Sequence, residues 1–419
     1  MTPMRFLSLL CAILFAAVQA FALRAIPPVQ PGDSSARAYL LTAAPGSEVY
    51  ELEGHSGLRL CYGETDAVAQ WGIFDFNSPN FVYRFCKGET DYMVGILPTY
   101  YFVKDYARQG RKVTSQQLNL TPEQVASLVE LVNENMLPEH RVYRYNYVKD
   151  NCATRVLEIV ERAIGQQIIV PDESLVKEES DVTFRSEMTR FHENYPWYQF
   201  GIDIALGSGL DYQITEREMT FAPVTLALYA GAARIVKGDK TVPFVTEVQT
   251  LSYGLEDGAV LPPTPWYLTP MVVGWMLLLI TLIVWAFDHH YLHRARLFDS
   301  LLFAAVGLTG CVVAFLLFIS THEATSPNWL IFWLNPLPLI LAVTIWFKGR
   351  KMFIFNSCLA LIYGALAGIG FWVLLFSDQQ VNGAIWTFYL ATIIRLYQYC
   401  DRPSRKYRMK ACQERILRR

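Results

Sequence analysis

Residues 150–155 read Asp150-Asn151-Cys152-Ala153-Thr154-Arg155 and mark the start of a predicted helix. Asn151 belongs to the residue types that cap helices, so the cap would place Cys152 in the first turn. A helix N-terminus carries partial positive charge, which stabilises a thiolate located there. Cys152 is therefore the candidate nucleophile of this chain.

The likeliest partner of Cys152 lies upstream, in Gly54-His55-Ser56-Gly57. A thiolate beside an imidazole can form an acyl-enzyme, and backbone N–H groups at the helix start can stabilise the oxyanion. The base also needs a group that orients it. The polar candidates on neighbouring predicted strands are Gln70 and Asp75, of which we prefer Asp75.

Arg155 and Asn151 are the candidate substrate-binding residues. Arg155 follows the thiol by about one helical turn. It would either hold an acidic group of the substrate or pair with a carboxylate at the surface, and both alternatives stay open.

The pattern around these motifs predicts an α+β domain. One helix begins at Thr121-Pro122-Glu123-Gln124, a capping box with proline at the first position, and another runs from Asn151 to Gly165. Short segments rich in β-branched and aromatic residues predict strands. These segments are Val49–Leu52, Leu58–Tyr62, Val68–Phe76, Phe81–Phe85, Tyr92–Leu97 and Val142–Val148.

The first 22 residues predict a secretory signal. Arg5 precedes the apolar run Phe6–Val18, and Ala20-Phe21-Ala22 favours cleavage after Ala22. An uncleaved first membrane helix is the alternative. Residues 23–266 then form the predicted globular domain, which is long enough for one sizeable core.

Residues 267–397 are predicted to form five transmembrane helices, because apolar stretches of about 20 residues suffice to cross a bilayer. The fifth is shorter and would extend through Arg395, whose head would snorkel to the membrane surface. The stretches are Leu268–Phe287, Phe298–Ile319, Trp329–Phe347, Phe353–Phe376 and Gly383–Ile394.

Charge predicts the orientation of these helices. Arg294 and Arg296 follow the first stretch, Lys348-Gly349-Arg350-Lys351 follows the third, and residues 398–419 form a basic tail. The alternate loops contain no Lys or Arg. The positive-inside rule places the basic segments in the cytoplasm, so the globular domain lies outside. The tail is read as a topology anchor and not as a nucleic-acid site.

Cysteine use also bears on the site. Outside the cytoplasm thiols tend to be oxidised, so Cys61 and Cys86 can form a disulfide with each other. Cys152 would then be the unpaired thiol of the three. The alternative is that all three are reduced and buried. No His/Cys cluster has metal-ligand spacing, and no cofactor is expected.

Polar residues also stand near the predicted outer ends of the spans, where they are candidates for helping to form a route for lipid. Asn335 is followed by Pro336 and Pro338, which break helical hydrogen bonding. The other polar residues are Thr321, His322, Glu323 and Asn328, and a solvated role in the loop is the alternative for His322 and Glu323.

The order of His55 first and then Asn151-Cys152 at a helix start resembles circularly permuted papain-like enzymes, such as the NlpC-type hydrolases and the lecithin:retinol acyltransferase-like proteins. A longer resemblance, over residues 49–223, is to the extracytoplasmic domain of the Lnb-type lipoprotein N-acyltransferases of bacteria. The matching pieces are Gly54-His55-Ser56-Gly57-Leu58-Arg59, Trp71-Gly72-Ile73-Phe74-Asp75-Phe76 with Pro79-Asn80-Phe81, Tyr145-Asn146-Tyr147, residues 150–155, and Leu206-Gly207 with Asp211. In the membrane half, Asn335-Pro336-Leu337 looks like the version with C-terminal spans.

This resemblance implies a multi-pass protein of the bacterial inner membrane whose catalytic domain is periplasmic. It implies an acyltransferase that moves a fatty acyl chain from a membrane phospholipid or other lipid ester, through a thioester on Cys152, to the N-terminal amine of diacylglyceryl lipoproteins. His55 would deprotonate the thiol. The alternatives are a membrane-tethered cysteine hydrolase of peptidoglycan and a non-catalytic membrane sensor. The acyl donor, the chain-length preference and the oligomeric state stay open.

Overall fold

The computed structural model describes residues 26–168, 182–255, 259–291 and 295–399. The chain divides into two compact units, one of residues 1–191 and 213–262 and one of residues 192–212 and 263–419. The second unit thus includes residues 192–212, which lie within the predicted globular domain. The predicted signal, residues 1–22, and nearly all of the basic tail lie outside the described residues.

The first unit is built on a seven-stranded sheet of order β6-β4-β3-β2-β1-β5-β9. All neighbouring strands pair antiparallel. A separate two-stranded sheet pairs β7 (Arg234–Lys237) with β8 (Lys240–Pro243). The strands of the large sheet are β1 (Arg37–Ala43), β2 (His55–Tyr62), β3 (Thr65–Ile73), β4 (Asp91–Pro98), β5 (Val113–Leu118), β6 (Val142–Arg144) and β9 (Val245–Ser252).

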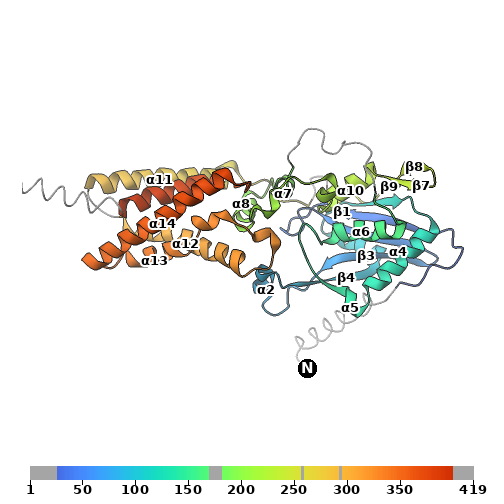
Figure 1. Cartoon of the computed structure of the whole chain (residues 1–419). Coiled ribbons are helices and arrows are strands. Elements are labelled where there is room, and N and C mark those ends of the chain that lie inside the picture. The colour runs from blue at the N-terminus through green and yellow to red at the C-terminus, as the bar shows by residue number, and fades with distance from the viewer. Residues whose placement is uncertain (1–25, 169–181, 256–258, 292–294, 400–419) are drawn as a thin grey trace, which may run out of the picture. The chain divides into compact units, whose positions relative to one another are not determined.

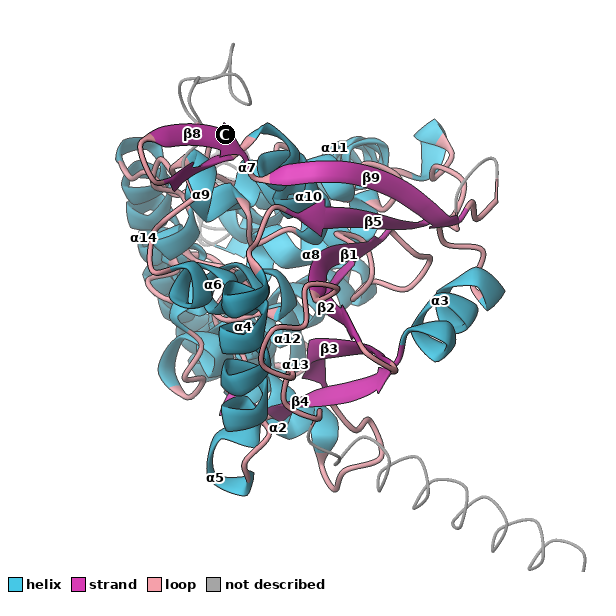
Figure 2. Ribbon diagram, turned by 90° about the vertical axis from the view of Figure 1, so that its right-hand side faces the viewer, coloured by secondary structure: helices cyan, strands magenta, loops and turns pink. Residues whose placement is uncertain are grey.

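Helices cover both faces of the sheet (Figures 1 and 2). On one face α6 (Cys152–Ile164) packs on β2 and β3, with α4 (Pro122–Asn135) and α10 (Pro223–Ala232) beside it. On the other face lies α3 (Thr99–Arg108). The remaining helices of this unit are α2 (Phe81–Lys87), α5 (Pro138–Arg141), α7 (Phe184–Phe191) and α9 (Glu216–Met219).

Alternation along β2 divides its side chains between the two faces. Leu58, Leu60 and Tyr62 belong to the large core with the apolar face of α6. A smaller core on the α3 side contains Val68 and Phe102. Helices pack on both faces of the sheet, and β2 lies in its middle. Packing on both faces therefore fixes the first residues of β2.

The helix starts predicted from the sequence are confirmed. Thr121 caps α4, and its hydroxyl accepts from the Gln124 N–H while the Gln124 side chain accepts from the Thr121 N–H. Asn151 caps α6, which ends at Gly165 in the left-handed conformation that glycine adopts most readily.

Three strand predictions are wrong. Phe81–Phe85 is part of helix α2, which starts after Asn80 at φ 54° and ends before Gly88 at φ 78°. Val49–Leu52 forms turns that enter β2. In Val142–Val148 only the residues of β6 form a strand, and an isolated bridge between Asn146 and Asp150 then turns the chain into α6.

The second unit is helical. Three of its helices are long and apolar enough to cross a membrane, namely α11 (Pro270–Tyr291), α12 (Arg296–Phe318) and α14 (Arg350–Phe376). Residues 384–399 are also helical where the fifth span is predicted. Shorter elements are α8 (Pro196–Ala205), η1 (Ser208–Leu210), η2 (Trp266–Leu268), η3 (Glu323–Thr325), η4 (Trp329–Phe332) and α13 (Leu337–Thr344).

The predicted third span, Trp329–Phe347, is not one continuous helix. It divides into η4 and α13, and Asn335 and Pro336 lie between them. The Asn335 side chain accepts from the Leu337 N–H and donates to the Phe332 carbonyl, which satisfies backbone groups freed by the break. A Cβ on Gly310 of α12 would lie 2.4 Å from the Asn335 backbone, so glycine permits this close approach.

The prediction that the Arg395 head reaches the membrane surface is wrong, because its side chain is fully buried. Its guanidinium donates to Asp299 at 2.5 Å and to Asp288 at 2.7 Å, and the Tyr399 hydroxyl donates to Asp299 at 2.7 Å. The buried charges join α11, α12 and the helix at 384–399.

Candidate active site

Cys152 is the first residue of α6, at the helix start that the sequence predicts. The Asn151 side chain accepts from the N–H groups of Ala153 and Thr154, and the Thr154 hydroxyl accepts from the Asn151 N–H. The Asn151 amide also donates to the carbonyls of Tyr147 at 2.7 Å and Phe221 at 2.8 Å. Asn151 thus fixes the helix start in four directions and acts as a structural cap here.

The Cys152 thiol is buried, with 7% of the residue exposed. Burial raises the pKa of the thiol to about 11, because a thiolate loses its hydration there. The backbone N–H groups of Ser56, Cys152 and Ala153 act in the opposite direction, and the Glu53 carboxylate adds to the rise by repulsion. The N–H groups at the helix start are therefore present, but burial outweighs them.

His55 is the first residue of β2 and lies against α3. Its Nε2 is 3.0 Å from the Gln70 side-chain oxygen, and its ring centroid is 6.0 Å from that of Tyr106 and 6.3 Å from that of Phe102. Burial lowers the pKa of His55 to about 4, although the Gln70 hydrogen bond partly opposes the shift. A donor role for Nε2 toward Gln70 leaves Nδ1 as the acceptor nitrogen.

The thiol and the imidazole both lie near the start of β2, but they pack against different helices. Cys152 packs in the core on the α6 side, whereas the His55 ring contacts residues of α3. Ser56, which follows His55 in the chain, directs its backbone N–H at the sulfur. Among the described residues the structure shows no hydrogen bond between the His55 ring and the Cys152 sulfur. Catalytic hydrogen bonds are often long in a ligand-free site and tighten when substrate binds.

The preferred orienting group, Asp75, does not contact His55. It is an exposed residue in the turn after β3, and its carboxylate accepts from the Asn77 N–H at 2.8 Å. Gln70 instead stands where the orienting group is expected. Its side chain leaves β3 on the same face as His55 and contacts the ring. Both residues are plausible from the sequence, but Gln70 lies within β3, whereas Asp75 lies beyond its end and beyond the irregularity between Gln70 and Ile73.

Arg155 takes the second of its two predicted alternatives and pairs with a carboxylate. It forms a two-pronged ion pair with Asp150, with Nη2 at 2.7 Å from the carboxylate, and its guanidinium lies 4.0 Å above the Tyr143 ring. Asp150 and Tyr143 thus hold the Arg155 guanidinium in place.

Two features beside the thiol do not stand out in the sequence. The first is Glu53, a buried carboxylate that accepts a hydrogen bond from the Tyr147 hydroxyl. The second is Gly72, at φ 87°, where a Cβ would lie 3.7 Å from the Cβ of Cys152 and 3.6 Å from Tyr145. The one sequence feature that marks them is their position, two residues before His55 for Glu53 and within the Trp71–Phe76 segment for Gly72.

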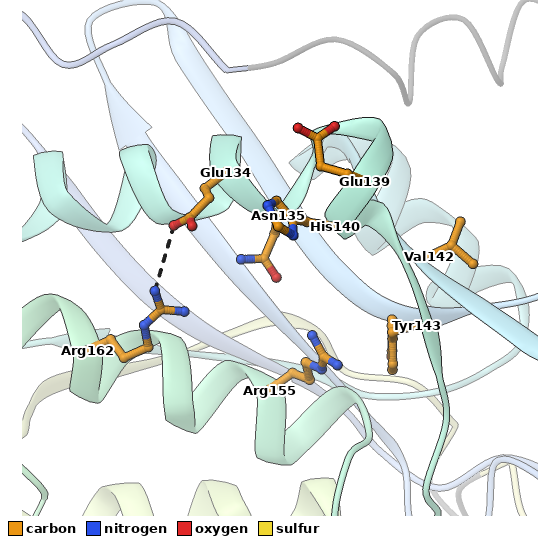
Figure 3. Close-up of a pocket in the computed structure, with 8 residues that line it drawn as sticks. All are labelled: Glu134, Asn135, Glu139, His140, Val142, Tyr143, Arg155 and Arg162. Carbon is orange, nitrogen blue, oxygen red and sulfur yellow. Dashed lines mark ion pairs between the residues drawn. The ribbon is translucent and has the colours of Figure 1, made fainter.

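A separate cavity of about 320 Å³ opens among α4, α5, β6 and α6 (Figure 3). Glu134 and Arg162 form an ion pair of 3.7 Å across it. Its lining contains neither Cys152 nor His55, so it is distinct from the thiol site. The lining residues are Glu134, Asn135, Glu139, His140, Val142, Tyr143, Arg155 and Arg162.

The other cysteines of this unit, Cys61 and Cys86, are free thiols in the structure and both are partly exposed. The predicted pairing is therefore not formed here. Among the described residues no group of three or more His, Cys, Asp or Glu side chains could hold a metal ion.

In the second unit, the polar residues considered for lipid access have structural partners. Asn328 donates to the Ile204 carbonyl at 2.8 Å and accepts from Gln379 at 3.1 Å. Asn335 lines an apolar cavity of about 630 Å³, together with Phe332, Pro336 and Leu339. A role for this cavity in lipid access stays a prediction.

Comparison with known protein families finds two matches. Residues 33–179 match the Lnb N-terminal periplasmic domain, and residues 263–401 match the Lnb transmembrane domain. Together they include His55, Cys152 and all three long apolar helices. No curated protein and no solved structure gives a significant match.

Proposed function

The chain belongs to the Lnb family of lipoprotein-processing membrane proteins, with a periplasmic domain and a transmembrane domain, and from this premise we propose that it is a lipoprotein N-acyltransferase. The acyl chain comes from a membrane lipid ester and passes through a thioester on Cys152. The acceptor is the N-terminal amine of a diacylglyceryl lipoprotein.

In the first half-reaction the Cys152 sulfur attacks the ester carbonyl, and His55 takes the thiol proton. At neutral pH both groups start neutral, because burial raises the pKa of the thiol and lowers that of the imidazole. Attack and proton transfer are therefore coupled, and no thiolate forms in advance. The C–O bond breaks, the lipid alkoxide takes the proton from His55, and the acyl thioester remains.

The N–H groups that face the sulfur support this chemistry. Those of Ser56 and Cys152 are directed at the sulfur, and in the proposed reaction they would stabilise the oxyanion, because fixed donors in a buried site stabilise such a charge strongly. The Gln70 side-chain oxygen lies 3.0 Å from Nε2 of His55, which leaves Nδ1 as the nitrogen that can take the thiol proton. Gln70 is thus the proposed orienting residue.

In the second half-reaction the lipoprotein amine attacks the thioester carbonyl. The C–S bond breaks, one amine proton passes to the sulfur and restores the thiol, and the other amine proton stays on the amide nitrogen. The sequence from ester to thioester to amide ends in the most stable of the three bonds. No nucleotide is consumed, which suits a periplasmic site.

The observation that carries the proposal is a buried thiol at a capped helix start, with backbone donors facing it and His55 on the adjoining strand. It is tested by mass spectrometry of lipoprotein N-termini from cells with the wild-type protein or with Cys152→Ala. We expect N-acylation to be lost in the variant. Unchanged N-acylation would overturn the proposal, and altered cell-wall peptides instead would indicate a peptidoglycan hydrolase.

A further inference from the structure

A row of aromatic rings leads from the Cys152 thiol to the surface of the periplasmic domain. Tyr145 lies beside Cys152 at Gly72. Its ring stacks on that of Tyr92, with centroids 4.3 Å apart, and Tyr92 is 4.9 Å from Phe74. Phe74 in turn lies 4.4 Å from Phe76.

The row ends in an exposed aromatic surface, which we define as Tyr50, Phe74, Phe76, Phe81 and Phe85. Phe81 contacts Phe74, Phe76 and Phe85 at centroid distances of 5.7, 5.1 and 6.0 Å. Tyr50, Phe76 and Phe85 are 52%, 54% and 48% exposed. Helix α2, which supplies Phe81 and Phe85, has no buried residue.

Three exposed aromatic residues, Tyr50, Phe76 and Phe85, thus gather around the partly exposed rings of Phe74 and Phe81. Contiguous exposed apolar surface generally marks a site that binds a partner, a ligand or a membrane. Aromatic rings also favour the interface between lipid head groups and hydrocarbon. The same chain carries three helices able to cross a bilayer, so this domain is tethered where phospholipid is abundant.

We propose that the aromatic surface binds an acyl chain of a membrane phospholipid and directs its ester toward Cys152. This deepens the proposed function and rests on it. The row of rings favours an acyl chain over a protein partner, because it connects the exposed surface to Tyr145, which lies beside Cys152 at Gly72.

The test compares a long-chain donor with a short one, using the full-length protein reconstituted in vesicles of phosphatidylethanolamine and phosphatidylglycerol. Acylation of Cys152 is followed by intact-protein mass, either from the vesicle lipid or from p-nitrophenyl acetate. The test variant is Phe76→Ser/Phe85→Ser. The control is Tyr100→Ser/Tyr101→Ser, which removes two aromatic rings of α3 that are 64% and 57% exposed and lie outside the row.

We expect the test variant to acylate from vesicle lipid about tenfold more slowly, because apolar contact with the chain is lost. Its reaction with p-nitrophenyl acetate should match the wild type, since that donor has no chain to bind. The control should match the wild type with both donors.

Three outcomes would contradict the proposal. Equal rates for test variant and wild type on vesicle lipid would overturn the inference alone. An equal loss with both donors would also overturn it, because the rings would then support the fold around the thiol. Failure of the wild-type protein to form any thioester would overturn the proposed function together with this inference.

Discussion

At Cys152 two influences oppose one another. Burial favours the neutral thiol, whereas the N–H groups of Ser56, Cys152 and Ala153 favour the thiolate. Burial prevails and raises the pKa of the thiol to about 11. The helix start, which in the sequence alone suggests a thiolate, therefore serves here to direct donors at the reacting centre.

The reactivity of the thiol with iodoacetamide should follow this pKa. Below it the thiolate fraction rises tenfold per pH unit, so the alkylation rate of Cys152 should climb from pH 7 and level off only near pH 11. Glu53→Gln should shift the profile to lower pH, because the repelling carboxylate is removed. A plateau already at pH 6 to 7 would show a preformed thiolate–imidazolium pair and contradict the account.

Gln70 and Asp75 provide a direct comparison at His55. Gln70→Leu should slow thioester formation between about ten- and a hundredfold, because the imidazole loses the group that orients it. Asp75→Asn should leave the rate unchanged, since Asp75 binds only the Asn77 N–H. The reverse pattern would restore Asp75 as the orienting residue.

Gln70→Glu adds a readout that a purely structural role would not change. A carboxylate on the imidazole stabilises its charged form and raises the pKa of His55 from about 4. The acid limb of the pH–rate profile should therefore move to higher pH. An unchanged acid limb would show that Gln70 does not act on His55 during the reaction.

Among the elements, α6 depends most on its N-cap residue, Asn151. Asn151→Ala removes two accepted and two donated hydrogen bonds, and unfolding should become easier by roughly 2–3 kcal/mol. Cys152 alkylation should change as well, because the helix start shifts. Thr121→Ala on α4 is the matched control and should cost about 1 kcal/mol without affecting the thiol. Equal thiol reactivity in both variants would contradict a positioning role for Asn151.

The sequence predicts elements well where local chemistry and tertiary packing agree. The capping side chains of Thr121 and Asn151 predict the starts of α4 and α6, and Gly165 predicts the end of α6. The residues of α2 have high strand propensity, yet they form a helix between left-handed Asn80 and Gly88. Propensity in so short a segment is a weak guide when neither face is buried.

In the candidate site, too, the sequence predicts the positions of some residues and not of others. Cys152 and His55 carry recognisable motifs, so their roles could be predicted. The choice between Gln70 and Asp75 depends on where β3 ends, because Asp75 lies in the turn after Ile73, and element boundaries are poorly specified by residue patterns. Tyr92 becomes a neighbour of the site only through the pairing of β4 with β3 in the sheet.

In the whole molecule, the membrane unit depends on one buried guanidinium. Arg395→Met would leave Asp288 and Asp299 without their cation, and removing one partner of a buried ion pair costs about 3–5 kcal/mol. Thermal unfolding in detergent should detect this loss. Adding Asp288→Asn and Asp299→Asn to Arg395→Met should restore most of it. A single variant as stable as wild type would show that the charges contribute little.

The central claim is that Cys152 carries the acyl chain, and the most direct measurement is the mass of the protein itself. Full-length protein in phospholipid vesicles, without lipoprotein acceptor, should gain one fatty acyl group on the peptide containing Cys152. Hydroxylamine at neutral pH should remove that group, and added diacylglyceryl lipoprotein should receive it as an amide. An acyl group located elsewhere, or N-acylated lipoprotein made by Cys152→Ala, would contradict the account.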